Sequence, residues 1–180
     1  MKIQALDWTM GDVGSVFVGL KGGSCRIDWG DGRTSSFKAH PYEVYPRHES
    51  HVYPSKCKKS GDIFDVVICS TEDNIVFLNT GCIDMAILDL TQNQDLEQLE
   101  IRGYDKERLD LSKCDKLWYL DCGSSRMKEI AISNNSVLKE VIFWDHCPLN
   151  ERSKRFINKV LALNDGSITI FNPINYGKTL

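Results

Sequence analysis

The apolar residues between Ile75 and Phe143 repeat with a period of 21 residues. Three columns of this repeat fall on segments of the form L-x-x-L-x-L: Ile75, Leu96, Leu117 and Leu138; Leu78, Leu99, Leu120 and Val141; Thr80, Ile101, Cys122 and Phe143. Two more columns fall on the short segments between them: Leu88, Leu109 and Ile130; Leu90, Leu111 and Ile132. A fixed period of this length predicts structural units that stack, each burying an apolar edge against its neighbours.

Stacking also places the residues between the leucines. Side chains at the x positions of a strand point away from the core, so units in register align them in columns on the outer face. The predicted outward columns are Phe77, Gln98, Tyr119 and Glu140; Asn79, Glu100, Asp121 and Ile142; Gly81, Arg102, Gly123 and Trp144. Large apolar groups beside arginine and acidic residues are typical of recognition surfaces.

We therefore predict a ligand-binding face on these strands, carrying Phe77, Arg102, Tyr119, Asp121, Ile142 and Trp144. The alternative interpretation is that another part of the molecule, or a neighbouring molecule, covers the same patch.

Before the repeat, the pattern changes to short apolar segments separated by turn residues. Strands are predicted at residues 16–20, 25–29 and 63–69, with an Asp-Gly turn at residues 30–32. Short strands at this spacing favour a small β-sandwich.

The first 72 residues resemble the PKD-like sandwich domain in three places: the segment IDWGDG at 27–32, the segment HVY at 51–53, and Gly61 followed by alternating Phe64, Val66 and Ile68. The Trp-to-Gly spacing is shorter than the family pattern, and the connection from residue 53 to residue 61 is longer. The resemblance implies an extracellular-type spacer or adhesion module, with Trp29 in the core and Gly30 and Gly32 permitting the turn.

The repeat itself resembles the short leucine-rich repeats of bacterial surface proteins, over residues 75–148. The chain departs from that pattern at the position after the main strand, which usually holds Asn and here holds Ile83, Tyr104, Ser125 and His146. Without an Asn side chain there, the turns must satisfy their backbone amides in another way.

After Pro148 the pattern predicts a helix and a final strand. Asn150 suits the N-cap, and the apolar helix face comprises Phe156, Ile157, Val160, Leu161 and Leu163; the strand is expected at residues 168–171. Together they would cover the apolar edge of the last unit. The predicted fold is mainly β: an Ig/PKD-like β-sandwich (1–72), a leucine-rich-repeat solenoid (73–148) and a helix–strand C-terminal cap (149–180).

Composition limits the classes of partner and the locations that we expect for the chain. The 180 residues carry a net charge of −3, which gives no electrostatic case for nucleic acid. No apolar run has the roughly 18 residues that a membrane span needs, and residues 1–14 contain no signal-peptide core. The resemblance nevertheless favours an extracellular or cell-surface location. Of the seven cysteines, Cys69 and Cys122 are expected to be buried, and a disulfide framework is the alternative for an exported protein.

Few residues are candidates for catalysis or metal binding. His48, His51 and Cys57 provide three loosely spaced ligands where zinc prefers four, and Asp28 and Asp31 lack the further carboxylates that calcium requires. The adjacent residues His146 and Cys147 would point to different faces, and Asp89 and Asp110 are expected to be solvated. We therefore predict no catalytic residue, metal or cofactor.

The function predicted from sequence is non-enzymatic binding of a protein or glycan by a monomer, through the outward strand face. A structural spacer of a surface or secreted assembly, without a ligand of its own, is the alternative. A hydrolase would require a convergent set of titratable groups in a deep cleft.

Overall fold

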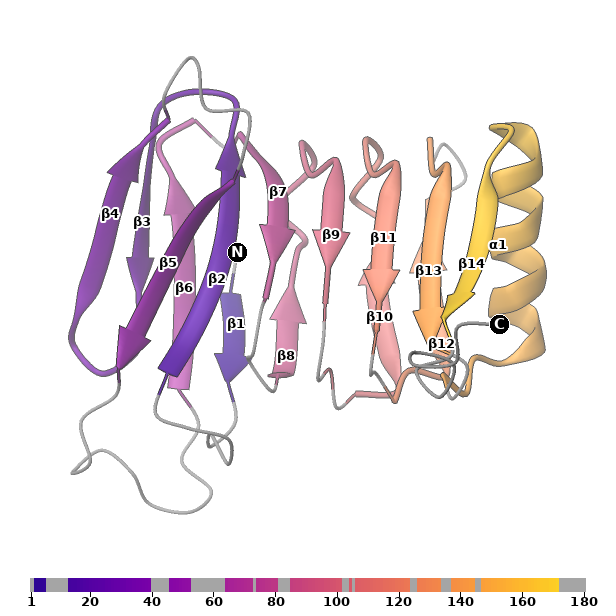
Figure 1. Cartoon of the computed structure of the whole chain (residues 1–180), viewed down its shortest axis with the longest axis horizontal. Helices are drawn as coiled ribbons and strands as arrows, with labels where there is room; N and C mark the ends of the chain where they lie inside the picture. Colours follow the sequence, from indigo (N-terminus) through magenta and orange to yellow (C-terminus); the bar gives the residue numbers. More distant parts are fainter. Residues whose placement is uncertain are drawn as a thin grey trace, which may run out of the picture.

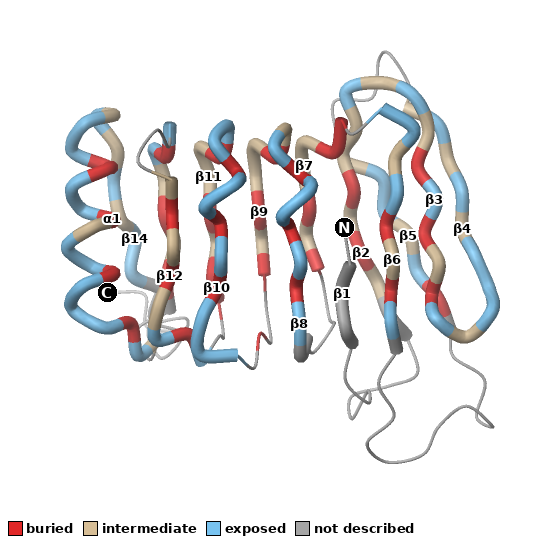
Figure 2. Tube along the Cα trace, turned by 180° about the vertical axis from the view of Figure 1, so that it is seen from behind, coloured by how far each residue is buried: buried red, intermediate tan, exposed pale blue. Residues whose placement is uncertain are grey.

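The computed structural model describes residues 2–5, 13–39, 46–52, 64–72, 74–80, 85–101, 104, 106–123, 126–133, 137–144 and 147–171. The strands of these residues form two facing layers, and a helix lies at the C-terminal end of the layers (Figures 1 and 2). The fold is mainly β, as predicted.

One layer is a seven-stranded sheet of order β14-β13-β11-β9-β7-β2-β5. Its strands are β14 (Ser167–Phe171), β13 (Glu140–Trp144), β11 (Tyr119–Cys122), β9 (Gln98–Glu100), β7 (Ile75–Asn79), β2 (Val13–Leu20) and β5 (Arg47–Val52). We call this layer the front sheet, because it lies nearer the viewer in Figure 1.

The other layer contains a five-stranded sheet of order β4-β3-β6-β1-β8 and a two-stranded sheet, β10-β12. Its strands are β4 (Thr34–Lys38), β3 (Ser24–Asp28), β6 (Phe64–Ser70), β1 (Lys2–Ala5), β8 (Met85–Asp89), β10 (Arg108–Leu111) and β12 (Glu129–Ile132). We call this layer the back sheets; they are nearer the viewer in Figure 2.

From β7 onward the chain alternates regularly between the layers. Strands β7, β9, β11 and β13 lie in the front sheet, and β8, β10 and β12 follow them in turn in the back sheets. After β13, helix α1 (Glu151–Leu163) takes the place of the next back strand, and the chain then returns to the front sheet as β14. The repeat therefore coils as successive parallel turns.

The predicted register of the repeat is confirmed. Phe77 pairs with Gln98, Gln98 with Tyr119, and Tyr119 with Glu140, always between parallel strands. The back strands follow the same spacing, with Leu109 opposite Ile130. One repeat of 21 residues therefore corresponds to one turn of the coil.

Burial follows the predicted columns. The members of the five apolar columns are buried, and Leu99 and Leu120 at the centre are 0% exposed. Strand side chains alternate between faces, so each leucine contacts its equivalents in the turns on either side. A single apolar cluster extends from Val16 through the repeat to Leu161.

The N-terminal strands join both layers of the repeat. In the front sheet β2 pairs antiparallel with β7, and in the back sheet β1 pairs antiparallel with both β6 and β8. Both sheets therefore continue across residue 72, where the sequence predicted a domain boundary. The division of the chain into three domains stays a prediction.

Sequence signals located many strands but not all. The Asp-Gly turn connects β3 to β4 as an antiparallel hairpin, and the strands predicted near residues 16, 25 and 63 are present as β2, β3 and β6. Strands β1, β4 and β5 were not predicted, because they are short or lie in polar segments. Of the two cysteines expected to be buried, Cys122 is, but Cys69 is exposed because it shares the outward face with Arg26, its partner on β3.

The predicted C-terminal helix is confirmed, including its cap. The Asn150 side chain accepts a 2.8 Å hydrogen bond from the backbone N–H of Ser153. Ile157, Val160 and Leu161 are buried and Phe156 is half-buried. Leu163 was wrongly placed on the buried face: it is the last residue of α1 and is 74% exposed.

The turns after the back strands are closed by aspartate. Asp89 accepts hydrogen bonds from the backbone N–H and the hydroxyl of Thr91, at 3.0 and 2.7 Å. One repeat later, Asp110 accepts from the backbone N–H of Ser112 at 3.0 Å. Both aspartates are exposed, as predicted, and these local bonds fix the direction in which the chain returns to the front sheet.

Of the four residues at the position that usually holds Asn, only Tyr104 lies among the described residues. It is buried, its hydroxyl donates to the Arg108 carbonyl at 3.0 Å, and its own carbonyl accepts from the Arg126 N–H at 3.2 Å. A tyrosine thus joins two successive repeats at this turn.

The described part of the chain contains no helix with the length and apolar character needed to cross a membrane.

Leu120→Ala should lower the free energy of unfolding by about 2–5 kcal/mol, because it leaves a cavity between stacked turns. Leu163→Ala is the matched control: its side chain is already exposed, so a change within about 0.5 kcal/mol is expected. Urea unfolding followed by circular dichroism measures both. Equal losses would contradict the assignment of the leucine column to the core.

Candidate functional site

The outward face of the front sheet is the candidate binding surface. The pairing of β7, β9, β11 and β13 aligns Phe77, Gln98, Tyr119 and Glu140 in one row across the sheet. A second row contains Asn79, Glu100, Asp121 and Ile142. The sequence predicted both rows, and the structure confirms their alignment.

Every member of these two rows is half-buried. Phe77, Tyr119 and Ile142 therefore keep part of their apolar surface in contact with solvent, although each packs beside its row neighbours. Trp118 precedes Tyr119, and the two rings meet edge to face with centroids 5.7 Å apart. This geometry holds the Tyr119 ring against a second aromatic group.

Polar contacts fix the acidic members of the face. The Asn79 amide donates to the Glu100 carboxylate, and Asp121 accepts from the Gly123 N–H at 2.9 Å. Lys21 forms an ion pair with Glu97, and the hydrogen bond to Glu97 raises the Lys21 pKa. The face thus combines ordered carboxylates with apolar rings.

The same face continues onto the N-terminal strands, which the sequence analysis did not foresee. Phe17 lies opposite Asn79 in the sheet and opposite His48 on β5. The Phe17 and His48 rings stack with centroids 4.4 Å apart and planes inclined by 18°. Gly19 lies opposite Phe77, and a Cβ at Gly19 would come within 2.8 Å of the Phe77 Cβ.

Two predicted site residues cannot be placed on this face in the same way. Arg102 lies outside the described residues. Trp144 ends β13 and pairs with Phe171 on β14, but its side chain is also outside the part that the structure describes. The described members of the predicted site are therefore Phe77, Tyr119, Asp121 and Ile142.

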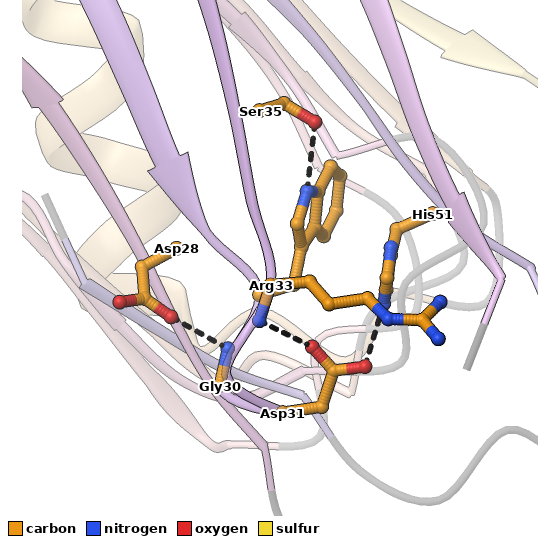
Figure 3. A network of polar contacts seen from close by, with 7 residues as sticks. Asp28, Gly30, Asp31, Arg33, Ser35 and His51 are labelled. Carbon is orange, nitrogen blue, oxygen red and sulfur yellow. Dashed lines mark hydrogen bonds and ion pairs between the residues drawn. The ribbon is translucent and has the colours of Figure 1, made fainter. Parts of the chain in front are cut away.

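A separate polar network surrounds the turn between β3 and β4 (Figure 3). Trp29 is 0% exposed, as the family resemblance implied, and its indole N–H donates to the Ser35 hydroxyl at 3.0 Å. The His51 ring stacks on Trp29 with centroids 5.2 Å apart. His51 Nε2 lies 2.8 Å from Asp31 Oδ2, and Asp31 Oδ1 accepts from the Arg33 N–H at 3.1 Å.

These contacts determine the protonation of Asp31. Burial by itself would raise the Asp31 pKa, but the hydrogen bonds from His51 and Arg33 and the charges of both residues lower it, and the net direction is down. Both oxygens of the carboxylate are engaged in the network. The arrangement ties the turn to β5, and the Asp31 side chain is only 1% exposed.

Gly30 permits this turn because it takes a φ of +80°. A Cβ there would lie 2.9 Å from the Asp65 carbonyl oxygen. Gly32 has a similar φ of +88°, but a Cβ at that position would meet nothing within 4 Å. The backbone of β6 therefore passes against Gly30 and not against Gly32.

The other candidate sites were a metal site and a reactive cysteine. No group of three or more His, Cys, Asp or Glu side chains suited to a metal ion occurs within the described ranges, and Cys57 and His146 fall outside them. Cys25, Cys69, Cys114, Cys122 and Cys147 are thiols that take part in no disulfide within the described ranges. Burial raises the pKa of Cys25 and of Cys114 to about 12, so these thiols are poor nucleophiles.

No protein-family model, curated protein or solved structure matches this chain.

Gly30→Ala should destabilise the fold by about 1–3 kcal/mol more than Gly32→Ala. Both changes place an alanine at positive φ, so the difference isolates the contact with Asp65. Urea unfolding of the two variants measures this difference. Similar losses would show that β6 does not pass as close to Gly30 as described.

Asp31 should make stability depend on pH in the acid range. Because its pKa is lower in the folded chain than the ordinary 3.8, its contribution is complete above that pH and is lost as the pH falls through the folded-state pKa. The native protein should therefore have a higher free energy of unfolding than Asp31→Asn, and this difference should shrink below pH 3.8. Urea unfolding across this range tests it, and parallel pH profiles for the two proteins would contradict it.

Proposed function

We propose that the chain is a non-enzymatic binding module that recognises a protein or glycan through the outward face of the front sheet. The observation that carries the proposal is that Phe77 and Tyr119 in one row and Ile142 in the next, all half-buried, lie on one face that extends from β5 to β14. Helix α1 packs against β12 and β14, at the C-terminal end of the two layers (Figure 1). It therefore does not cover the middle of this face.

The chemistry of the face suits such a partner. Aromatic rings pack against the apolar faces of sugars or against apolar side chains, and carboxylates accept hydrogen bonds from hydroxyl or amino groups. Tyr119 and Asp121 supply one group of each kind on the same strand. Because the carboxylates are already held by neighbouring donors, little further ordering would be needed when a partner binds.

The coiled parallel turns also support the fold proposed from sequence, a leucine-rich-repeat solenoid that follows a PKD-like sandwich and ends in a helix–strand cap. Proteins built of stacked repeats use extended surfaces formed by equivalent positions of successive units. The rows at Phe77 and Asn79 are surfaces of this kind. The proposed location, by the same resemblance, is extracellular or at a cell surface.

The experiment compares the native chain with Tyr119→Ala/Ile142→Ala on a glycan array and in quantitative pull-downs. Ligands of the proposed face should bind the native chain and lose about tenfold or more in affinity to the variant, because two apolar contacts are removed. Since both side chains are only half-buried, the melting temperature should change little.

Ile87→Ala is the matched control. Ile87 is 43% exposed on β8, in the back sheet, so its removal should leave binding unchanged. A large loss of stability in the double variant would place its side chains in the core and contradict the proposal. An array and pull-down without any ligand would favour the structural spacer instead.

A further inference from the structure

A second surface, on the opposite side of the molecule, has a different chemistry. A groove of about 480 Å³ lies between strand β12 and helix α1, two elements that are labelled in Figure 2. Arg152, Arg155 and Lys159 line its helical wall. Their spacing of three and four residues places these cations along one side of α1.

The cations of the helical wall are available to a ligand. Arg152, Arg155 and Lys159 are exposed, and none of them forms an ion pair with a residue that the structure describes. Lys154, by contrast, is outside the groove and pairs with Glu151 at 3.0 Å. A local excess of positive charge therefore exists in a chain whose net charge is −3.

The sheet wall of the groove is nearly neutral. It holds Arg108, whose guanidinium lies 3.9 Å from Glu129 and 4.0 Å from Asp110. These carboxylates balance Arg108 and do not reach the helical wall as ion-pair partners. The charge of the groove thus comes from α1.

The repeat lacks an acidic residue at the position that lines this groove. The column that holds Asp89 and Asp110 in the first two back strands holds Ala131 in β12, as the pairing of Asp110 with Ala131 shows. The hydroxyl residue of the turn is retained, however: Thr91 and Ser112 are followed in this series by Ser133. Only the carboxylate is missing, and Ala131, which stands in its place, lines the groove.

Apolar surface accompanies the positive charge. Ala131 and Phe156 are both half-buried and both line the groove. Together they offer a place for one apolar side chain between the cations of α1 and the edge of β12. A small inorganic anion would use the cations but not this apolar floor.

We propose that the groove between β12 and α1 binds an acidic peptide segment that carries an apolar side chain. The apolar side chain packs on Phe156 and Ala131, and carboxylates on either side of it pair with Arg155, Lys159 and Arg152. Charge complementarity selects the partner. This site is separate from the outward face of the front sheet and does not depend on the function proposed for that face.

The sharpest test restores the missing residue of the repeat. Ala131→Asp places a carboxylate in the groove at a position where Asp89 and Asp110 show that the turn accepts it; Ala131→Asn adds the same bulk without the charge. The probe is a fluorescein-labelled peptide of glutamate and leucine, with binding followed by anisotropy. Because Ala131 belongs to the apolar floor, Ala131→Asn should itself weaken binding. Ala131→Asp should bind about tenfold more weakly than Ala131→Asn, since these two variants differ only in charge.

A second pair of variants tests the helical wall without touching the sheet. Arg155→Gln/Lys159→Gln should weaken binding by about tenfold, whereas Lys113→Gln/Lys154→Gln, which removes the same charge from exposed positions outside the groove, should not. All four positions are exposed, so melting temperatures should stay close to the native value.

Three outcomes would overturn the proposal. One is equal binding of a peptide in which glutamine replaces glutamate. Another is an equal effect of the two double variants, which would indicate attraction by overall charge. The third is a sulfated polysaccharide that binds in the groove while the peptide does not, which would identify a site for polyanions other than peptides.

Discussion

The fold depends on one constraint: no single turn of the repeat can bury its own apolar edges. Leu99 and Leu120 are shielded from water because each lies between equivalents 21 residues away. A slip of one residue in the pairing would turn every leucine outward and every row residue inward. The outward face of the front sheet therefore exists only as long as the leucine columns stay in register.

Polar contacts follow the same spacing. Asp95 pairs with Lys116, Glu107 with Lys128 and Arg108 with Glu129, each across one repeat. Exposed pairs of this kind contribute little net stability, so they accompany the register and do not determine it. The turn aspartates act differently, because Asp89 and Asp110 bond to their own backbone and direct the chain from one layer to the other.

Much of this architecture could be predicted because the period is visible in the side chains. The rows of Phe77 and Asn79 were obtained from spacing alone, and the Asn150 cap from residue type. Strands β4 and β5 could not be predicted because they are polar and owe their place to pairing with β3 and β2. Cys69 shows the other limit: within a continuous apolar run, the sequence does not show which residues point into the core and which point outward.

The groove at α1 shows what a sequence pattern contains without revealing it. The spacing of Arg152, Arg155 and Lys159 was visible, as was the change from Asp110 to Ala131 in the repeat. Neither suggests a site by itself, since basic residues on a helix are usually solvated. Only the replacement of a back strand by α1 brings the two together.

That replacement, together with the antiparallel joint at β7, defines the two ends of the coil and leaves the number of turns between them free. Duplication of one 21-residue segment in the middle would recreate the neighbours of Leu99 and Leu120 and need no new kind of contact. Each added turn would move α1 about 4.8 Å further from β2. Gene duplication could therefore lengthen the molecule one turn at a time.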